Sequence, residues 1–216
     1  MYLTIENLSK TIKGALVLQD INLSLDRGKV YGLRGKNGSG KTMLMRAIAG
    51  LIRPTAGYVR VNGQVIGTDV SFPPSIGLLL ENPAFIGSYT GFKNLQVLAG
   101  IQARIDDEKI RATLEAVGLD PHDRRPYRKY SLGMKQRLGV ACAVMEDPDL
   151  VLLDEPTNAL DPAGVAQVRT LVSACKQRGA LVLVACHDAD ELDLLADEVF
   201  TMAEGRIVNS ATGSTR

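Results

Sequence analysis

The chain has 216 residues, of which 45% are hydrophobic and 23% are charged, and its formal net charge is +1. This composition is typical of a globular protein with a substantial core, and the small net charge gives no electrostatic case for binding nucleic acid or an anionic membrane. No stretch approaches the ~18 apolar residues of a membrane span, so any membrane role is expected to come through a partner. Three scattered cysteines without metal-like spacing predict reduced core thiols in a cytosolic protein.

The N-terminal part of the chain predicts short strands joined by polar turns. Residues Tyr2–Asn7 alternate apolar and polar side chains, as do residues 21–25, and this period of two is typical of half-buried strands. The lysine-rich segment Lys10–Lys13 is expected to form an exposed connection between them. Farther along, Asn62-Gly63 separates two extended segments and predicts a hairpin with a type I′ turn.

Apolar runs alternate with helical periodicity in the rest of the chain. Buried strands are predicted at Val30–Leu33, Ile76–Leu80, Leu150–Leu153 and Leu181–Cys186. Helices are predicted at Met43–Gly50, Thr90–Ala103, 106–118, Leu132–Met145, 161–179 and Ala189–Ala196, before a final hairpin. This alternation predicts an α/β fold, a P-loop core with a mainly parallel sheet covered on both faces and an N-terminal antiparallel β part. Residues 1–216 are expected to form one domain, with a helical subdomain at approximately 84–145 inserted in the core.

One glycine-rich stretch, Gly35–Thr42, has the sequence GKNGSGKT and matches G-x-x-x-x-G-K-[ST] at every fixed position. A predicted strand precedes it and a predicted helix follows, a geometry that points backbone N–H groups and a helix N-terminus at one anion. Glycines allow close approach to phosphate oxygens, Lys41 supplies a charge for the β- and γ-phosphates, and Thr42 offers a hydroxyl to Mg²⁺. The alternative is a plain glycine-rich turn. The predicted nucleotide-binding residues are Gly35, Lys36, Asn37, Gly38, Ser39, Gly40, Lys41, Thr42 and Met43.

Polar residues directly follow two of the predicted buried strands. Ligands of parallel sheets bind beyond the carboxyl ends of the strands, so these residues are expected near the glycine loop. Asp154 is predicted to hold Mg²⁺, and Glu155, which points the other way, is predicted to be the general base. His187 is expected to hydrogen-bond the γ-phosphate or to orient the attacking water. Taken alone, an acidic pair at the end of a strand is also typical of a solvated turn. A lone histidine in such a place is also typical of a residue that caps a helix or packs in the core.

The order of these motifs resembles the nucleotide-binding domain of an ABC transporter across essentially the whole chain. The motif after the glycine loop, YSLGMKQR, corresponds to the family's LSGGQ-type signature followed by its usual Gln-Arg. Leu132 and Met134 replace the common Gly and Gln of that signature. The segments that carry the resemblance are Gly35–Thr42, Tyr130–Arg137, Leu150–Thr157 (LVLLDEPT), Asn158–Asp161 (NALD) and His187.

The resemblance implies that ATP binds with Mg²⁺ and that two such domains, identical or different, meet head to tail. Ser131 and Gly133 of one subunit then cap the ATP held by the other, and in this family Asn158–Asp161 crosses between the two sites. A hydroxyl at a helix N-terminus is a sensible anion site, although Ser131 is equally an ordinary N-cap. An integral membrane permease is a further implied partner, which places the protein at the cytoplasmic face of the membrane. No nucleic-acid partner is expected.

Two positions depart from the family pattern. Glu81 occupies the position of the family's Q-loop glutamine and is expected to contact the metal or its water. Gln both donates and accepts hydrogen bonds, whereas an ionised Glu only accepts them. Ile12 stands about where the family stacks an aromatic ring on adenine, and it offers apolar contact without a π-face. This predicts weaker or less base-selective nucleotide binding.

The signature SLGMKQR with Glu81 resembles bacterial antibiotic and lantibiotic exporter ATPases of the bacitracin-transport type. By the same resemblance, Asn82–Phe92 forms much of a groove for a helix of the membrane subunit. The apolar residues of that segment are also compatible with core packing; they are Phe85, Ile86, Tyr89 and Phe92.

The predicted function is therefore ATP hydrolysis that powers a separate membrane permease, an exporter of antibiotic or peptide type. Two alternatives stay open. One is a soluble ABC-type ATPase that is not coupled to transport. The other is a weakly hydrolysing regulatory subunit, which the departures at Ile12, Glu81 and Met134 keep in consideration.

Overall fold

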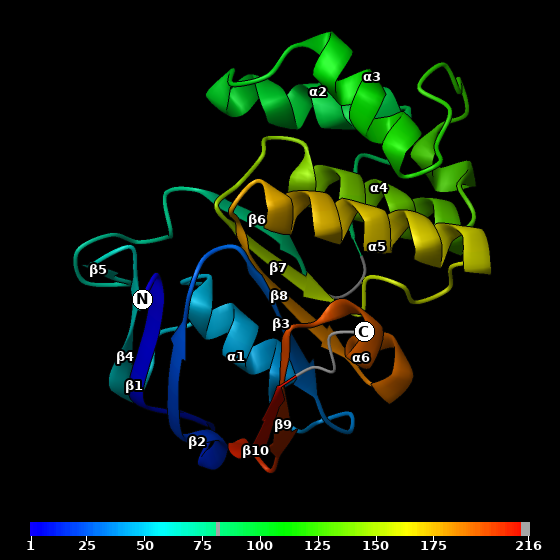
Figure 1. The fold of residues 1–216 in the computed structure, drawn as a ribbon. Helices are drawn as coiled ribbons and strands as arrows, with labels where there is room; N and C mark the ends of the chain where they lie inside the picture. The colour runs from blue at the N-terminus through cyan, green and yellow to red at the C-terminus, as the bar shows by residue number, and fades with distance from the viewer. Residues whose placement is uncertain (81–82, 213–216) are drawn as a thin grey trace.

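The strands form two sheets in the computed structural model, which describes residues 1–80 and 83–212 (Figure 1). A four-stranded antiparallel sheet has the order β2-β1-β4-β5, and a six-stranded sheet has the order β10-β9-β3-β8-β7-β6. The strands are β1 Leu3–Ile12, β2 Ala15–Leu25, β3 Lys29–Arg34, β4 Ala56–Val61, β5 Gln64–Val65, β6 Ile76–Leu79, β7 Leu150–Asp154, β8 Leu181–Cys186, β9 Glu198–Ala203 and β10 Arg206–Thr212. This arrangement confirms the predicted α/β class and its N-terminal antiparallel part.

The six-stranded sheet is parallel except at one edge. Strands β9, β3, β8, β7 and β6 run parallel, while β10 pairs antiparallel with β9. The two central apolar runs, β7 and β8, are buried along their whole length, as the uninterrupted hydrophobic sequence requires when both faces are covered. Because parallel strands end on the same side, β3, β7 and β8 deliver their following residues to one edge of the sheet.

Successive residues of β7 enter different cores. Leu150 and Leu152 pack with α1 and the antiparallel sheet, whereas Val151 and Leu153 pack with α4 and α5 on the opposite face. This is the period of two that a strand imposes on its side chains. The helices are α1 Lys41–Ile48, α2 Gly91–Gln102, α3 Asp107–Ala116, α4 Leu132–Val144, α5 Pro162–Gln177 and α6 Ala189–Leu195, with a 3₁₀ turn at Tyr127–Lys129.

The predicted exposed connection at Lys10–Lys13 is wrong. Residues up to Ile12 continue β1, and the chain turns at Lys13 and Gly14, both with positive φ, before β2 returns alongside. The alternating pattern is interrupted because Asn7 has a φ of 49° and the register shifts between Ile5 and Leu8. Such a bulge breaks the period of two, so the strand extends beyond the point where its sequence pattern ends.

The helix boundaries follow from side-chain caps. Asp106, Ser131 and Asp161 each accept a hydrogen bond from a backbone N–H in the first turn of α3, α4 and α5 respectively. The predicted hairpin turn at Asn62-Gly63 is confirmed, since both residues have positive φ. Helices α2, α3 and α4 lie between neighbouring strands β6 and β7 in the chain, and their treatment as a separate subdomain stays a prediction.

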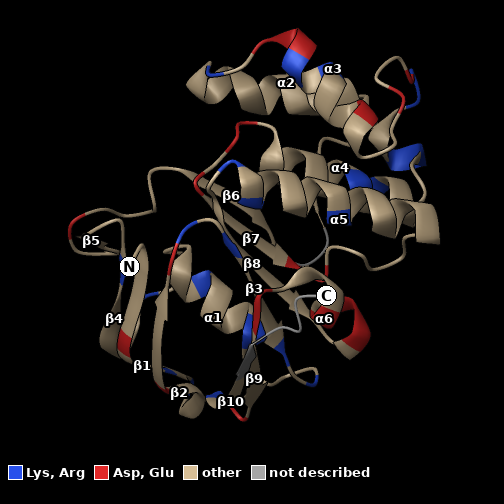
Figure 2. Cartoon of the chain, viewed as in Figure 1, with Lys and Arg blue, Asp and Glu red and all other residues tan. Residues whose placement is uncertain are grey.

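No helix in the described part of the chain combines the length and the apolar content that crossing a membrane requires. One group of acidic residues lies on α6, whose first turn carries Asp190 and Glu191 (Figure 2). Negative side chains at that end are favourable, because the unpaired N–H groups of a helix N-terminus carry a partial positive charge.

Candidate functional site

The glycine loop Gly35–Thr42 joins β3 to α1 in a conformation that its glycines make possible. Gly40 has a φ of +107°, and a Cβ at Gly35 would meet the backbone oxygen of Met202 at 2.5 Å. Around Gly38, whose φ is +81°, a Cβ would meet nothing within 4 Å. The loop is therefore tightly wrapped at its start and open at its tip, where a ligand can approach the backbone.

Two polar side chains of the loop, those of Ser39 and Lys41, are buried, whereas Lys36 and Asn37 are exposed. Lys41 is 6% exposed, and its Nζ donates to the backbone oxygens of Gly35 at 2.6 Å and Lys36 at 3.3 Å. The Oγ of Ser39 is buried and has no hydrogen-bond partner among the described residues. A buried hydroxyl without a partner is costly, and a bound phosphate oxygen would satisfy it. A held ammonium, an orphaned hydroxyl and the N-terminus of α1 together fit a polyphosphate.

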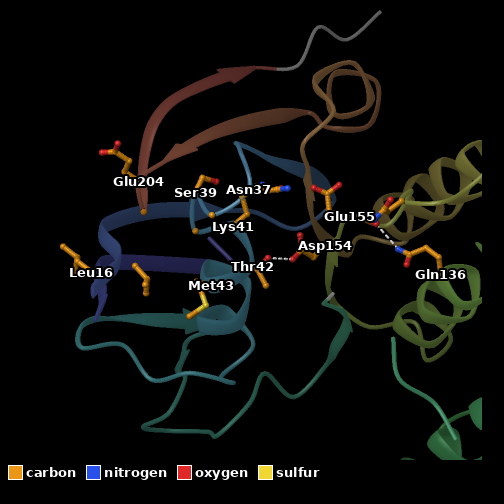
Figure 3. A pocket seen from close by; sticks show the side chains of 15 residues that line it. Leu16, Asn37, Ser39, Lys41, Thr42, Met43, Gln136, Asp154, Glu155 and Glu204 are labelled. Atoms are coloured by element: carbon orange, nitrogen blue, oxygen red, sulfur yellow. Dashed lines mark hydrogen bonds between the residues drawn. The ribbon is translucent and has the colours of Figure 1, made fainter. Parts of the chain in front are cut away.

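Two oxygen donors meet beside the loop. The hydroxyl of Thr42 donates to Oδ2 of Asp154, a carboxylate that is 5% exposed at the end of β7 (Figure 3). Hydroxyl and carboxylate oxygens are the ligands that Mg²⁺ prefers, so this pair fits the ion. Sequence reasoning assigned both residues to the metal, and the fold brings them together from positions 112 residues apart.

Glu155 is held by its neighbours through its carboxylate and through its backbone. Its Oε2 lies 2.8 Å from Nδ1 of His187, and its own backbone has a φ of +50°, an uncommon conformation for a non-glycine residue. The backbone N–H of Glu155 donates to the backbone oxygen of Ala185 at 2.8 Å. The backbone oxygen of Glu155 accepts a hydrogen bond from Nε2 of Gln136, also at 2.8 Å. The carboxylate side chain is 25% exposed, so it is positioned and accessible at once.

These residues line a cleft of about 730 Å³. Leu16 and Glu204 lie at one end, and Gln136 and Glu155 lie at the other, with the glycine loop between them (Figure 3). The lining consists of Leu16, Val17, Asn37, Gly38, Ser39, Gly40, Lys41, Thr42, Met43, Gln136, Asp154, Glu155, Asn158, Glu204 and Gly205. A hollow of this size, with apolar Leu16 and Val17 on one side of a glycine loop suited to phosphates, suits a nucleotide.

Other predicted site residues lie outside this lining. Gly35 and Lys36 begin the loop, and His187 reaches the site through Glu155. Ile12 lies at the end of β1 opposite Ala15, and the apolar residues that line the cleft are Leu16 and Val17. Glu81 lies outside the described residues. The apolar residues of the 85–92 segment divide between two environments: Phe85 and Phe92 pack against the core, whereas Ile86 and Tyr89 are 47% and 37% exposed. The groove for a helix of the membrane subunit stays a prediction.

Ser131 and Gly133 stand at the start of α4. The hydroxyl of Ser131 accepts from the N–H of Met134 at 3.2 Å, which is the N-cap role that the sequence left open. A Cβ at Gly133 would meet the backbone oxygen of Ala159 at 2.9 Å, so a side chain there would push against the Asn158–Asp161 loop. Neither residue lines the cleft of its own chain.

Sequence reasoning assigned no role to Gln136, which bonds the backbone of Glu155. It also missed Asn158 and Glu204 as cleft residues. The signal for Gln136 was present, because the motif places this amide one turn after the helix start. Nothing in the sequence indicated that the β9–β10 turn at Glu204 closes over the glycine loop.

A strand, a glycine loop and a helix, with an acidic pair on a neighbouring parallel strand, define a P-loop nucleotide-binding protein. The family model for ABC transporters matches residues 18–158, so the chain belongs to the ABC transporter family, as one of its ATPase subunits. The predicted resemblance to an ABC transporter ATP-binding subunit is thereby confirmed.

Similar proteins support the assignment to the ABC transporter family. The chain is 43% identical over 204 residues to the uncharacterized ABC transporter ATP-binding protein YybJ of Bacillus subtilis (strain 168), covering 94% of each chain. It is 38% identical to the bacitracin transport ATP-binding protein BcrA of Enterococcus faecalis, covering 94% of this chain and 67% of that protein. It is 34% identical to the lantibiotic transport ATP-binding protein SrtF of Streptococcus pyogenes, covering 95% and 89%.

Solved structures share the fold. An ATP-binding subunit of an ABC transporter superposes with a TM-score of 0.89 at 26% identity, covering 98% of this chain and 90% of that one. The cassette MJ0796, in a dimeric post-hydrolysis state bound to ADP and Pi, gives the same TM-score of 0.89 at 20% identity, covering 99% and 100%. At that identity the second likeness bears on the fold alone.

Proposed function

We propose that this protein hydrolyses ATP to drive a separate membrane permease that exports an antibiotic or peptide. The observation that carries the proposal is the meeting of two pairs at one cleft. Thr42 with Asp154 supplies oxygen donors, and Glu155 with His187 supplies a positioned carboxylate. Hydrolysis of a phosphoanhydride requires oxygen ligands for Mg²⁺ next to an accessible general base.

Each residue has a defined task in this proposal. The loop backbone, Ser39 and Lys41 hold the phosphates, and Thr42 and Asp154 hold Mg²⁺, which neutralises charge that develops on the phosphate oxygens. Glu155 accepts the proton of the attacking water. His187, when its Nδ1 carries the proton, donates to Oε2 of Glu155 and fixes the direction of that carboxylate.

A second ATP-binding subunit, identical or different, completes the site. Ser131 and Gly133 lie outside the cleft of their own chain, as expected for residues that cap the nucleotide of a partner. The N-terminus of α4 with its Ser131 hydroxyl is a suitable anion cap. Dimers occur among structures of the same fold, of which the MJ0796 cassette is one.

The transport functions of two relatives support the proposal of a permease partner and of an antibiotic or peptide cargo. BcrA and SrtF serve bacitracin and lantibiotic transport respectively, and this chain is 38% and 34% identical to them. Since no described helix of this chain is suited to a membrane crossing, the path for the cargo lies in another subunit. The protein is then peripheral, bound through the permease at the cytoplasmic face. No nucleic acid takes part.

The experiment is ATP turnover with Mg²⁺, with wild type compared with Glu155→Gln and with sedimentation in ATP run in parallel. Wild type should turn over, while Glu155→Gln should lose turnover and accumulate as an ATP-bound dimer. Glu115→Gln is the matched control, because Glu115 is exposed on α3, does not line the cleft, and should leave turnover at the wild-type rate. Absence of turnover both alone and with a permease in vesicles would refute the proposed activity.

A further inference from the structure

A thiol, an imidazole and a carboxylate converge where β8 ends. Glu155, Cys186 and His187 each present one donor atom, and these three atoms all lie within 4.8 Å of one another. Cys186, the last residue of β8, is 2% exposed, whereas the His187 side chain is 64% exposed. The group is therefore anchored in the core on its sulfur side and open to solvent on its imidazole side.

The thiol has no part in hydrolysing a phosphoanhydride as proposed above. Cys186 belongs to the same buried cluster as Val182 and Val184, the residues that share its face of β8. Packing alone would be satisfied by an aliphatic side chain there. The sulfur instead accepts a hydrogen bond from the N–H of Asp188 at 3.4 Å and lies beside the carboxylate of Glu155.

We propose that Glu155, Cys186 and His187 form a binding site for Zn²⁺ or a similar soft divalent cation, and that its occupation stops ATP hydrolysis. Sulfur, imidazole nitrogen and carboxylate oxygen are the donors that Zn²⁺ takes in proteins, and three protein ligands leave a fourth position for water. The second half of the proposal rests on the proposed function, because it requires Glu155 to be the base.

The distances suit the ion after small movements. Zn²⁺ binds these donors at about 2.0–2.3 Å in a tetrahedron, which places ligand atoms roughly 3.3–3.8 Å apart. The Glu155–His187 contact of 2.8 Å must open slightly, and the sulfur, within 4.8 Å of both, must approach. Rotation of the exposed imidazole and the half-buried carboxylate supplies that change while Cys186 stays in the strand.

A backbone N–H beside the sulfur favours the thiolate form of Cys186. Coordination requires the thiolate, so the proton of Cys186 leaves to solvent as the metal binds. The N–H of Asp188 already donates to that sulfur and would stabilise the bound thiolate, as partners around metal ligands commonly do. Asp190, three residues after His187 in the first turn of α6, adds negative charge to this part of the chain, whereas the neighbouring Glu191 is paired with Arg169.

The two cations separate by chemistry. Mg²⁺ prefers the oxygen pair of Thr42 and Asp154, and it has little affinity for sulfur. Excess Mg²⁺ therefore does not displace Zn²⁺ from Cys186. An ion bound to Oε2 of Glu155 occupies the lone pair that would take a proton from water, and it separates that carboxylate from His187. Both effects remove the base.

The binding test uses Co²⁺ as a spectroscopic probe on the full untagged chain, without added thiols or chelators. Wild type should bind one Co²⁺ with a sulfur-to-cobalt charge-transfer band. Cys142→Ala, a partly buried cysteine elsewhere in the core, should keep the band, whereas Cys186→Ala should lose it. Affinity should fall by at least about tenfold, since even indirect partners of a metal cost that much.

A second variant keeps the test decisive if Cys186→Ala folds poorly. His187→Asn changes an exposed side chain and should weaken Co²⁺ binding while the thermal unfolding transition stays in place. Absence of the band in wild type, or its persistence in Cys186→Ala, would overturn the site. Loss of the band in Cys142→Ala would do so as well.

The inhibition test is separate. Zn²⁺ added to wild type in excess Mg²⁺ should suppress ATP turnover, and the half-inhibiting concentration should rise at least about tenfold in Cys186→Ala, measured against that variant's own rate. A cobalt band without inhibition by Zn²⁺ would overturn the inhibitory role and leave the site intact. Lack of turnover in wild type would instead count against the proposed function, because the cobalt band does not depend on hydrolysis.

Discussion

The amide of Gln136 offers a direct test of how the carboxylate of Glu155 is positioned. Gln136 is 6% exposed on α4, and its Nε2 donates to the backbone oxygen of Glu155 at 2.8 Å. That bond supports a residue whose φ is +50°, in the left-handed region. Gln136→Ala removes the donor but leaves the loop that holds the phosphates untouched. Turnover should fall while the KM for ATP stays close to the wild-type value.

The magnitude follows from the lost hydrogen bond. A bond of this kind contributes about 1 kcal/mol, so its loss lowers the population of the productive conformer, relative to its alternatives, about fivefold. The strain of the left-handed backbone at Glu155 is present in wild type and in the variant, so it makes that conformer dependent on the bond but adds nothing to the difference between the two proteins. Turnover should therefore fall about fivefold, at 1.36 kcal/mol for each factor of ten.

The assay is steady-state ATP hydrolysis with Mg²⁺, accompanied by thermal unfolding. Gln96→Ala is the matched control, since Gln96 also lies part-buried on a helix but bonds Asp107 on α3. It should keep wild-type turnover. If Gln136→Ala, folded as wild type, turns over within about twofold of wild type, the hydrogen bond does not position the base and the reasoning fails.

Two further predictions concern stability. Gly77→Ala should destabilise the fold by about 3 kcal/mol or more in urea denaturation, since its Cβ would meet a backbone oxygen at 1.7 Å. Gly100→Ala on helix α2, where a Cβ would meet nothing within 4 Å, should instead stabilise the fold by about 0.5–1 kcal/mol in the same assay. The N–H of Gly164 and the guanidinium of Arg137 lower the pKa of Asp161 below 3.8, so its ionised form stabilises the fold above that pH and the contribution disappears in stronger acid. Asp161→Asn should reduce the drop of the urea midpoint between pH 7 and pH 3; an equal drop would contradict the assignment.

The phosphate-binding part of the site could be predicted because its information is local. The spacing within Gly35–Thr42 fixes a loop whose glycines are needed where the backbone turns, and the structure places Thr42 against Asp154 as expected. Strands β7 and β8 of the central sheet could also be predicted from the sequence, because their uninterrupted apolar residues favour burial on both faces.

The rest of the cleft depends on contacts that no local pattern encodes. Leu16 reaches it only because β2 begins earlier than its alternation indicates, after a bulged β1. Glu204 reaches it because the β9–β10 turn folds back, where the N–H of Gly205 donates to the oxygen of Ser39 at 2.9 Å. Positive φ at Asn7 and Asp20 adjusts both strands, and such bulges are set by pairing partners rather than by residue pattern.

The place of β3 in the sheet has a consequence for how the chain folds during synthesis. Its two neighbours in the sheet are β8 and β9, which pair with it through residues 181–186 and 198–201. The strand that leads into the glycine loop therefore forms its strand-to-strand hydrogen bonds only after these late segments of the chain have been synthesised. Contacts between segments so distant in sequence form slowly and expose unpaired strand edges in the meantime. A ribosome-bound chain that has emerged only to residue 180 carries the whole phosphate loop without either flanking strand. Nucleotide affinity should therefore arise abruptly, once residues 181–203 have left the exit tunnel.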